Sequence, residues 1–446
     1  MAKRKRKLPI LFNRNALAIA RNNARCVRAV RRGFKLGKIK VSDYVDRISN
    51  LPSDLRFKIL SFLPIEQAGR ASLLSKDWKE VWEFSNQLHI SEMGFLGLNR
   101  HQDYMDQFLP RLRAPNLDSF SFAFTRADVY YSQVRRLIIF AIDRRPKTVS
   151  LNFSDPNDAR RPSYPLPDVF YDQPSLETLS LGNCALDTGQ FRKFTSLKCL
   201  TLGHISLGEN GAVLEEILGA CEAIETLILQ NVRVLFDITI KSTNLTSLTI
   251  EDCRVFAFEL YTPNLIFFKY HGTELLLQPG MIDETFVFNT MSPVRKVDIK
   301  FVGTPCNDRR IVGDIAHKLL TDLRAEMRTL TICSFTSQAL SKGDRMANVL
   351  QLGVTELTIK TALHDEEFEG IVVLLRSCPN LERLTLIINK ENVCTTYLPP
   401  LHPISHELNF PCVRSTLKEV SVHGYKDQSS QPGWMSANQS RSLELV

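Results

Sequence analysis

The sequence predicts an α/β protein in which a small helical domain near the N-terminus is followed by a long, irregular solenoid with a parallel sheet on its concave face. Helical apolar stripes occur within residues 47–82, and short leucine-containing fragments recur along the rest of the chain. With 446 residues, of which 44% are hydrophobic, the composition is globular, and the length suits a few domains or one elongated array.

The charge is concentrated at the N-terminus. Residues 1–40 hold 14 Lys or Arg and no acid, which leaves 42 basic and 48 acidic residues, a net of −6, in the remainder. The cluster Lys3, Arg4, Lys5, Arg6 and Lys7 is typical of a nuclear localisation signal or a nucleic-acid patch. A disordered solvated tail, a weak basic amphipathic helix and an Arg-rich mitochondrial presequence are the alternatives for this arm.

Three short helices are expected in the apolar stretch that follows. Ser53 is placed to cap the first helix, whose apolar side chains form a broad stripe, and Pro64 separates it from the second. Ser75 is placed to cap the third, on which Trp78 and Trp82 share one face. Such a bundle is at the lower limit for independent folding, and its apolar residues exceed what it can enclose. The surplus therefore faces either a partner or the following domain.

This stretch resembles an F-box, in particular the plant type that precedes leucine-rich repeats. The resemblance rests on Asp46–Pro52, Ile59–Pro64, Leu73–Lys76 and the two tryptophans, and it covers about 45 residues. It implies docking onto a Skp-type adaptor, which links the chain to the cullin and RING subunits of a ubiquitin ligase. The positions that match the docking face or its support are Leu51, Pro52, Ile59, Leu60, Leu63, Leu74 and Trp78.

The body of the chain repeats the pattern L-x-x-L-x-L-x-x-N/C-x-L, which is typical of leucine-rich repeats. Four full copies begin at Leu176, Leu197, Ile224 and Leu245. Shorter copies begin at Leu117, Pro146, Leu265, Val294, Met327, Val354, Leu381 and Leu417. A single unit cannot bury its leucines, so neighbours are expected to stack, with each L-x-L segment forming one strand of the sheet.

Residues between the leucines are expected to point off this sheet into the concave face, where a target would bind. They are Ser180, Thr201, Ile228, Thr249, Lys269, Asp298, Thr331, Thr358 and Thr385. Cys184, Cys253 and Asn389 fall at the Asn/Cys position of the repeat, and Cys221 and Cys378 precede strands, so packing explains them better than metal or redox chemistry.

The C-terminal region resembles the start of the FBD region found in plant F-box proteins with leucine-rich repeats, on the fragment of residues 410–425. The polar residues that follow do not continue that pattern. The expected domains are therefore a basic arm at 1–40, an F-box at 41–90, a solenoid at 91–425 whose FBD-like end covers about 380–425, and a disordered tail at 426–446.

Motifs for catalysis are missing from the sequence: it contains no Walker A, Rossmann glycine, H-E-x-x-H or G-x-S-x-G pattern. His402 and His406 are four residues apart, but surrounding prolines exclude a regular helix that could pair them on a metal. The acidic run at 365–369 is expected to be a solvated helix start. No catalytic residue, metal or cofactor is expected, and no membrane helix.

The sequence therefore predicts a non-catalytic substrate-recognition subunit of a Skp-cullin-F-box ubiquitin ligase, acting in the nucleus or cytoplasm, with an unidentified protein target. The alternative is a nuclear nucleic-acid-binding or scaffold protein that uses the basic arm. The absence of aromatic residues interleaved with the arm's basic ones argues against nucleic acid as the partner.

Overall fold

A computed structural model covers residues 1–446, and it describes the larger part of the chain from residue 51 onward. The described residues are 51–63, 65–71, 78, 81–92, 109–155, 162–208, 211–232, 237–253, 257–272, 286–288, 293–302, 309–342, 350–362, 365–388, 410–424 and 441–444.

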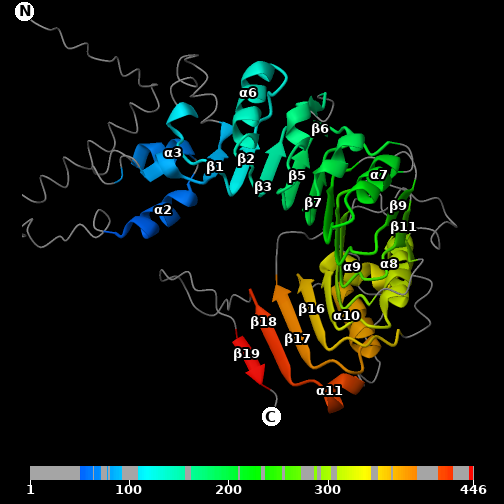
Figure 1. The fold of residues 1–446 in the computed structure, drawn as a ribbon. Coiled ribbons are helices and arrows are strands. Elements are labelled where there is room, and N and C mark those ends of the chain that lie inside the picture. The colour runs from blue at the N-terminus through cyan, green and yellow to red at the C-terminus, as the bar shows by residue number, and fades with distance from the viewer. Residues whose placement is uncertain are drawn as a thin grey trace, which may run out of the picture.

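A 14-stranded sheet runs through the described chain and curves into an arc that is open on one side (Figure 1). All neighbours are parallel except the last pair, which is antiparallel. In spatial order the strands are β1 (Gln87–Ile90), β2 (Ser119–Ala123), β3 (Thr148–Asn152), β5 (Thr178–Gly182), β7 (Cys199–Gly203), β8 (Thr226–Gln230), β10 (Ser247–Glu251), β12 (Phe267–Gly272), β14 (Lys296–Phe301), β15 (Thr329–Cys333), β16 (Glu356–Thr361), β17 (Arg383–Ile388), β18 (Glu419–His423) and β19 (Arg441–Glu444).

The leucine pattern sets both the position and the orientation of these strands. Each of the predicted repeat starts lies two residues before a strand, from Leu117 before β2 to Leu417 before β18. Because side chains alternate across a strand, the apolar residues of the pattern all fall on the core side. On β14, for example, Val297, Ile299 and Phe301 are buried, whereas the residues between them are half-buried or exposed. The predicted fold class is confirmed.

The chain leaves several strands through residues in the left-handed region. Asn183, His204, Asn231 and Asp252 have φ values of 51–52°, which Asn, Asp and His tolerate better than most residues. Their backbone N–H groups donate to the carbonyl at the end of the next strand, as from Asn183 to Gly203 at 2.9 Å. These bonds continue the ladder beyond the sheet and turn each chain segment toward the convex side.

Helices and short strands cover the convex side of the arc (Figure 1). On α6, buried Val134, Leu137, Ile138 and Ala141 follow helical spacing and pack on the sheet. The convex elements are η3 (Leu109–Arg111), α6 (Tyr131–Ile142), β4 (Tyr164–Pro165), η4 (Asp168–Tyr171), β6 (Cys184–Ala185), η5 (Thr188–Lys193), α7 (Ala212–Ala220), β9 (Ile238–Lys241), β11 (Phe258–Tyr261), β13 (Phe286–Phe288), α8 (Arg309–Leu323), α9 (Ser334–Leu340), α10 (Asp365–Ser377) and α11 (Pro411–Ser415). Strands β13, β11 and β9 form a second parallel sheet that sequence analysis missed.

The cysteines of the repeats serve packing and turns. The Cys184 thiol donates to the carbonyl of Gly182, and the Cys253 thiol lies 3.4 Å from the carbonyl of Glu251. Cys221 donates to the carbonyl of Phe191 at 3.2 Å, and Cys378 is fully buried. The structural interpretation of these four cysteines is confirmed, and Asn389 lies outside the described residues.

The F-box end of the chain consists of α2 (Ser53–Ser61), α3 (Ile65–Ala71) and the 3-10 turn η2 (Val81–Phe84). It adjoins the first strands of the arc (Figure 1). The expected cap at Ser53 is wrong: Ser53 is already helical and its hydroxyl donates to Asp54, so the helix begins without a side-chain cap. Most of the expected third helix lies outside the described residues.

Two further expectations need correction. Residues 441–444, placed in a disordered tail, instead pair with β18, whose outer edge offers unpaired backbone groups to any extended segment. Glu367, placed in a solvated acidic run, is fully buried and accepts hydrogen bonds from Ser334, Thr361 and the backbone N–H of Ala362. A buried carboxylate of this kind is stable because every oxygen has donors.

Candidate functional site

An exposed apolar stripe runs along α2 at the F-box end. Leu55, Ile59 and Phe62 are spaced i, i+4 and i+7, so they share one face of the helix. Their exposed fractions are 51%, 42% and 74%, which is unusual for large apolar side chains. Leu60 and half-buried Leu63 lie on a neighbouring side of the helix and pack against the rest of the described chain. Apolar residues therefore lie on more than one side of the helix, and the described part of the chain covers only some of them.

The structure separates the residues predicted to bind the adaptor into three groups. Pro52 and Ile59 are exposed and Leu51 and Leu63 are half-buried against the core, whereas Leu60 and Trp78 are each only 2% exposed. Leu74 lies outside the described residues. Leu60 and Trp78 therefore belong to the core and do not contribute to the exposed stripe.

Leu55 and Phe62 complete the stripe, although neither was named as an adaptor-binding residue from the sequence. Their spacing from Ile59 was visible in the sequence and could have found them. What the sequence did not reveal was which apolar side of α2 turns inward.

The residues predicted for the concave face do lie together. Each is the register neighbour of the next, from Ser180 beside Thr201 to Thr358 beside Thr385. The row extends in both directions, to Ser150 on β3 and to Ser421 on β18. Most of its members are half-buried, while Thr249 is only 7% exposed. One continuous row of side chains therefore crosses the inner surface of the arc; that it binds a target stays a prediction.

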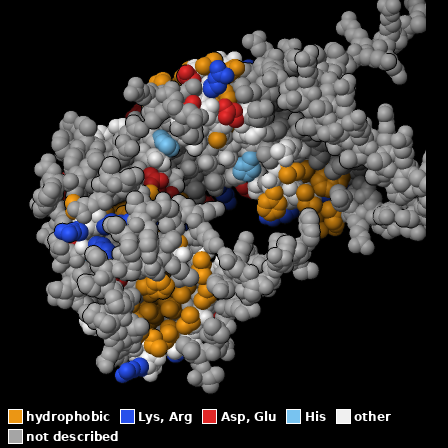
Figure 2. Space-filling model, turned by 180° about the vertical axis from the view of Figure 1, so that it is seen from behind, with side chains coloured by type: hydrophobic (Ala, Val, Ile, Leu, Met, Phe, Trp, Pro, Cys, Tyr) orange, Lys and Arg blue, Asp and Glu red, His pale blue; other side chains and the backbone are white. Residues whose placement is uncertain are grey.

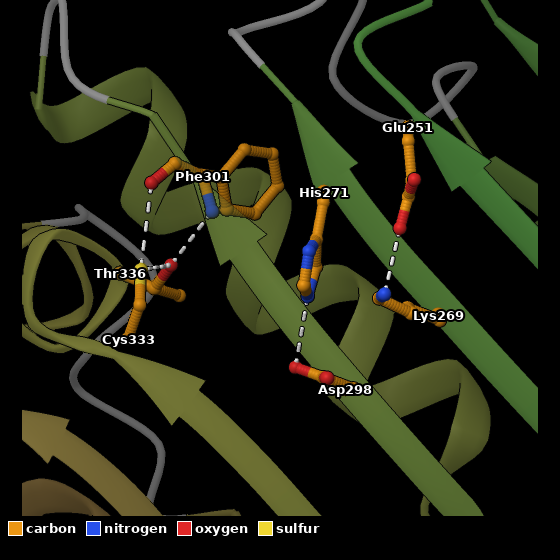
Figure 3. Close-up of polar contacts among 7 residues, drawn as sticks. All are labelled: Glu251, Lys269, His271, Asp298, Phe301, Cys333 and Thr336. Carbon is orange, nitrogen blue, oxygen red and sulfur yellow. Dashed lines mark hydrogen bonds and ion pairs between the residues drawn. The ribbon is translucent and has the colours of Figure 1, made fainter. Parts of the chain in front are cut away.

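A group of charged side chains occupies the middle of this surface. Nζ of Lys269 lies 2.6 Å from Oε1 of Glu251, and Nε2 of His271 lies 3.1 Å from Oδ1 of Asp298. Figure 3 shows the four side chains projecting from the face of the sheet opposite to the helices. In Figure 2, histidine, acidic and basic side chains are visible around the hollow of the arc.

These contacts alter the acidity of both carboxyl groups. Burial alone would raise the pKa of Asp298, but the neighbouring His271 and the charges of Lys360 and Lys269 outweigh this effect, and the pKa is lowered. Burial would also raise the pKa of Glu251, but hydrogen bonds from Lys269 and Gln230 outweigh this effect, and its pKa is lowered. Both groups are therefore held as carboxylates.

Other kinds of site receive no support from the described part of the chain. Among the described residues, no three His, Cys, Asp or Glu side chains come together in a way that could hold a metal ion. None of the described helices is long and apolar enough to cross a membrane. His402, His406 and the basic cluster Lys3–Lys7 lie outside the described residues.

The curved parallel sheet and the small helical domain define a leucine-rich-repeat protein with an F-box. The chain belongs to the family described as the At1g61320/AtMIF1, LRR domain, whose pattern matches residues 112–430, and residues 48–88 match the F-box domain. Members of this class are generally non-catalytic adaptors, and an F-box implies binding of a Skp-type adaptor.

The chain is also similar to several plant proteins of Arabidopsis thaliana. It is 27% identical to the putative F-box/LRR-repeat protein At5g54820 over 76% of this chain and 75% of the relative. It is 27% identical to the putative F-box protein At3g29830 over 85% of each. The FBD-associated F-box protein At4g10400 is 26% identical over 61% of this chain and 64% of its own length.

Proposed function

We propose that the chain is the substrate-recognition subunit of a Skp-cullin-F-box ubiquitin ligase. The F-box binds the Skp-type adaptor, through which the cullin and RING subunits are recruited, and the concave face of the solenoid binds a target protein. The chain supplies proximity rather than covalent chemistry, because it holds the lysines of the target at high effective concentration near the conjugating enzyme.

The observation that carries this proposal is the stripe of Leu55, Ile59 and Phe62. A free apolar surface of this kind marks a protein interaction site. Burying each of these side chains under a partner contributes on the order of 1 kcal/mol or more, which adds up to a useful share of a stable interface. Because α2 lies at one end of the arc, a partner on this stripe leaves the concave face open.

The test is co-expression with a Skp-type adaptor and purification through a tag on the adaptor. Ile59→Asp and Phe62→Asp place a charge in the stripe without touching the core, so the chain should fold but no longer co-purify. Val169→Asp is the matched control, because Val169 on η4 is 47% exposed and far from α2 along the chain. It should co-purify as the wild type does.

Substitutions at Leu60 and Trp78 are unsuitable for this test, because both side chains are buried and their loss would unfold the F-box. If the wild-type chain does not co-purify with the adaptor, or if the Ile59 and Phe62 variants bind as well as wild type, the proposal is wrong.

A further inference from the structure

The concave face is divided into an uncharged half and a charged half. At the concave positions, strands β2, β3, β5 and β7 carry only Ser, Thr, Cys, Ala, Asn and Gly. Beginning with Glu251 on β10, nearly every strand adds a charged side chain. A partner that lies along the arc therefore meets fixed charge only on its C-terminal half.

Several acidic side chains of the charged half have a partner among the described residues. Glu251 pairs with Lys269, and Asp298 lies against His271. Glu356 forms an ion pair with Arg383. Glu419 accepts a hydrogen bond from Ser421 at 3.1 Å. Glu251 and Glu356 are thus compensated by a cation, whereas Glu419 has only a hydroxyl partner.

The basic side chains are not balanced in the same way. Among the described residues, Lys296 and Lys300 on β14 and Lys360 on β16 form no ion pair. Lys296 lies 5.6 Å from the centre of the Phe267 ring, and the charge of Lys360 acts on Asp298 from beyond ion-pair distance. Lys296 and Lys300 are four residues apart on one strand, about 13 Å in extended chain, and β15 separates Lys300 from Lys360 by about 10 Å. Positive charge is thus spread over the surface at intervals instead of converging on one point.

We propose that the charged half of the concave face binds an extended acidic segment of the target, with Lys300 and Lys360 as its main contacts. This inference rests on the proposed role of the solenoid as the target-binding part. Carboxylates on alternate or every fourth residue of an extended chain repeat at about 7 or 13 Å. The longer repeat matches Lys296 and Lys300, and the flexible lysine stems span the difference from the separation of about 10 Å between Lys300 and Lys360. The face complements such a segment in charge where its lysines form no ion pair and where Glu251 and Glu356 already have cationic partners.

Spaced carboxylates fit this surface better than a single phosphate. Phosphate is held best by the planar fork of arginine, and Arg383, the arginine at a concave position of this half, is already paired with Glu356. Lysine acts as a point charge on a flexible stem, which suits separate carboxylate partners. The uncharged half then accommodates the neutral remainder of the target.

The test uses the full chain purified with its adaptor and a fluorescent peptide in which Glu alternates with Ser. Gln replaces Glu in a second peptide, and a third carries one phosphoserine in the Gln background. The variant is Lys300→Gln with Lys360→Gln. The control is Lys147→Gln with Lys193→Gln, which removes the same charge from exposed lysines elsewhere. Both variants keep the basic N-terminal segment, so any peptide binding by that segment is the same in both.

The Glu peptide should bind more tightly than the Gln peptide. The variant at Lys300 and Lys360 should bind the Glu peptide about three- to tenfold more weakly than wild type, whereas the control variant should bind it as wild type does. Raising the salt from about 0.05 M to about 0.3 M should weaken this binding further. Equal binding of the Glu and Gln peptides, equal binding by the variant and the control, or tighter binding of the phosphoserine peptide would overturn the inference. A chain that binds the Glu peptide but not the adaptor would refute the proposed function alone.

Discussion

Glu83 and Arg111 join the F-box to the solenoid. Nη2 of Arg111 donates a hydrogen bond to Oε1 of Glu83 at 2.7 Å, and Nε of Arg113 lies 3.2 Å from the other carboxylate oxygen. The Glu83 side chain is only 6% exposed, whereas both arginines are more than half exposed. The guanidinium of Arg111 also lies over the ring of Trp82, with 5.0 Å between them. A buried carboxylate on η2 thus fixes the start of the solenoid against the last turn of the F-box.

Replacing Glu83 should loosen this joint. Glu83→Ala removes the hydrogen-bond acceptor of Arg111 and the ion-pair partner of Arg113. We expect a loss of only about 1–2 kcal/mol, because the exposed arginines regain water. Thermal unfolding should begin at lower temperature, and hydrogen exchange should accelerate at residues 81–84. The pair of Glu215 and Lys241 is exposed on both sides, so Glu215→Ala should leave stability nearly unchanged. Equal effects of the two variants would contradict the importance of the joint.

The contact between α9 and α10 depends on a glycine. A Cβ at Gly370 would lie 1.8 Å from the carbonyl oxygen of Ser337, so the two helices would have to separate. We expect Gly370→Ala to destabilise the chain by about 1–3 kcal/mol, the range for overpacked cores. At Gly219 on α7 a Cβ would meet nothing within 4 Å, so Gly219→Ala should be neutral or slightly stabilising. Unfolding midpoints of the two variants measure the difference, and a stable Gly370 variant would refute the close packing.

The thiols of the repeats should be protected from alkylation in the folded chain. Burial raises the pKa of Cys253 and of Cys378 to about 12 and that of Cys221 to about 11. Cys199 is half-buried on the concave face, and burial raises its pKa as well. Iodoacetamide reacts only with a thiolate that it can reach. At pH 8 it should therefore modify Cys199 at least about tenfold faster than the buried thiols. Peptide mass spectrometry gives the rates, and rapid labelling of Cys253 in the folded state would contradict the burial.

The contact between Asp298 and His271 should make the free energy of unfolding depend on pH. The folded pKa of Asp298 lies below its ordinary value of 3.8, so its contribution is present above that value and is lost as the pH falls through the folded pKa. Asp298→Asn should therefore be less stable than wild type near pH 6, and this deficit should shrink below about pH 4. A deficit that is constant with pH would show that the charge of Asp298 has no part in it.

Sequence reasoning located the repeats well because the leucine pattern acts locally. Leu and Ile at fixed intervals identify each strand, and the side-chain alternation of a strand then assigns Thr201 or Thr358 to the opposite face without any tertiary knowledge. The same reasoning missed β1, because no leucine stands two residues before Gln87–Ile90 and the strand lies at the edge of the sheet beside β2.

What the sequence could not predict depends on contacts between distant segments. Glu83 and Arg111 are 28 residues apart, and nothing in either neighbourhood indicates the pair. Glu367 was taken for a solvated acid because its donors come from Ser334 and Thr361 on other elements. Ile59 and Leu60 are adjacent and both apolar, and only the fold decides that Leu60 turns inward and Ile59 outward.

The most direct measurement of the central claim is thiol labelling of the purified adaptor complex. Ile59→Cys and Val169→Cys introduce thiols at positions of similar exposure in this chain, 42% and 47%. If the adaptor covers the stripe on α2, the thiol at position 59 should react at least about tenfold more slowly than the one at position 169. Equal reaction of the two thiols in a stoichiometric complex would show that the adaptor binds elsewhere.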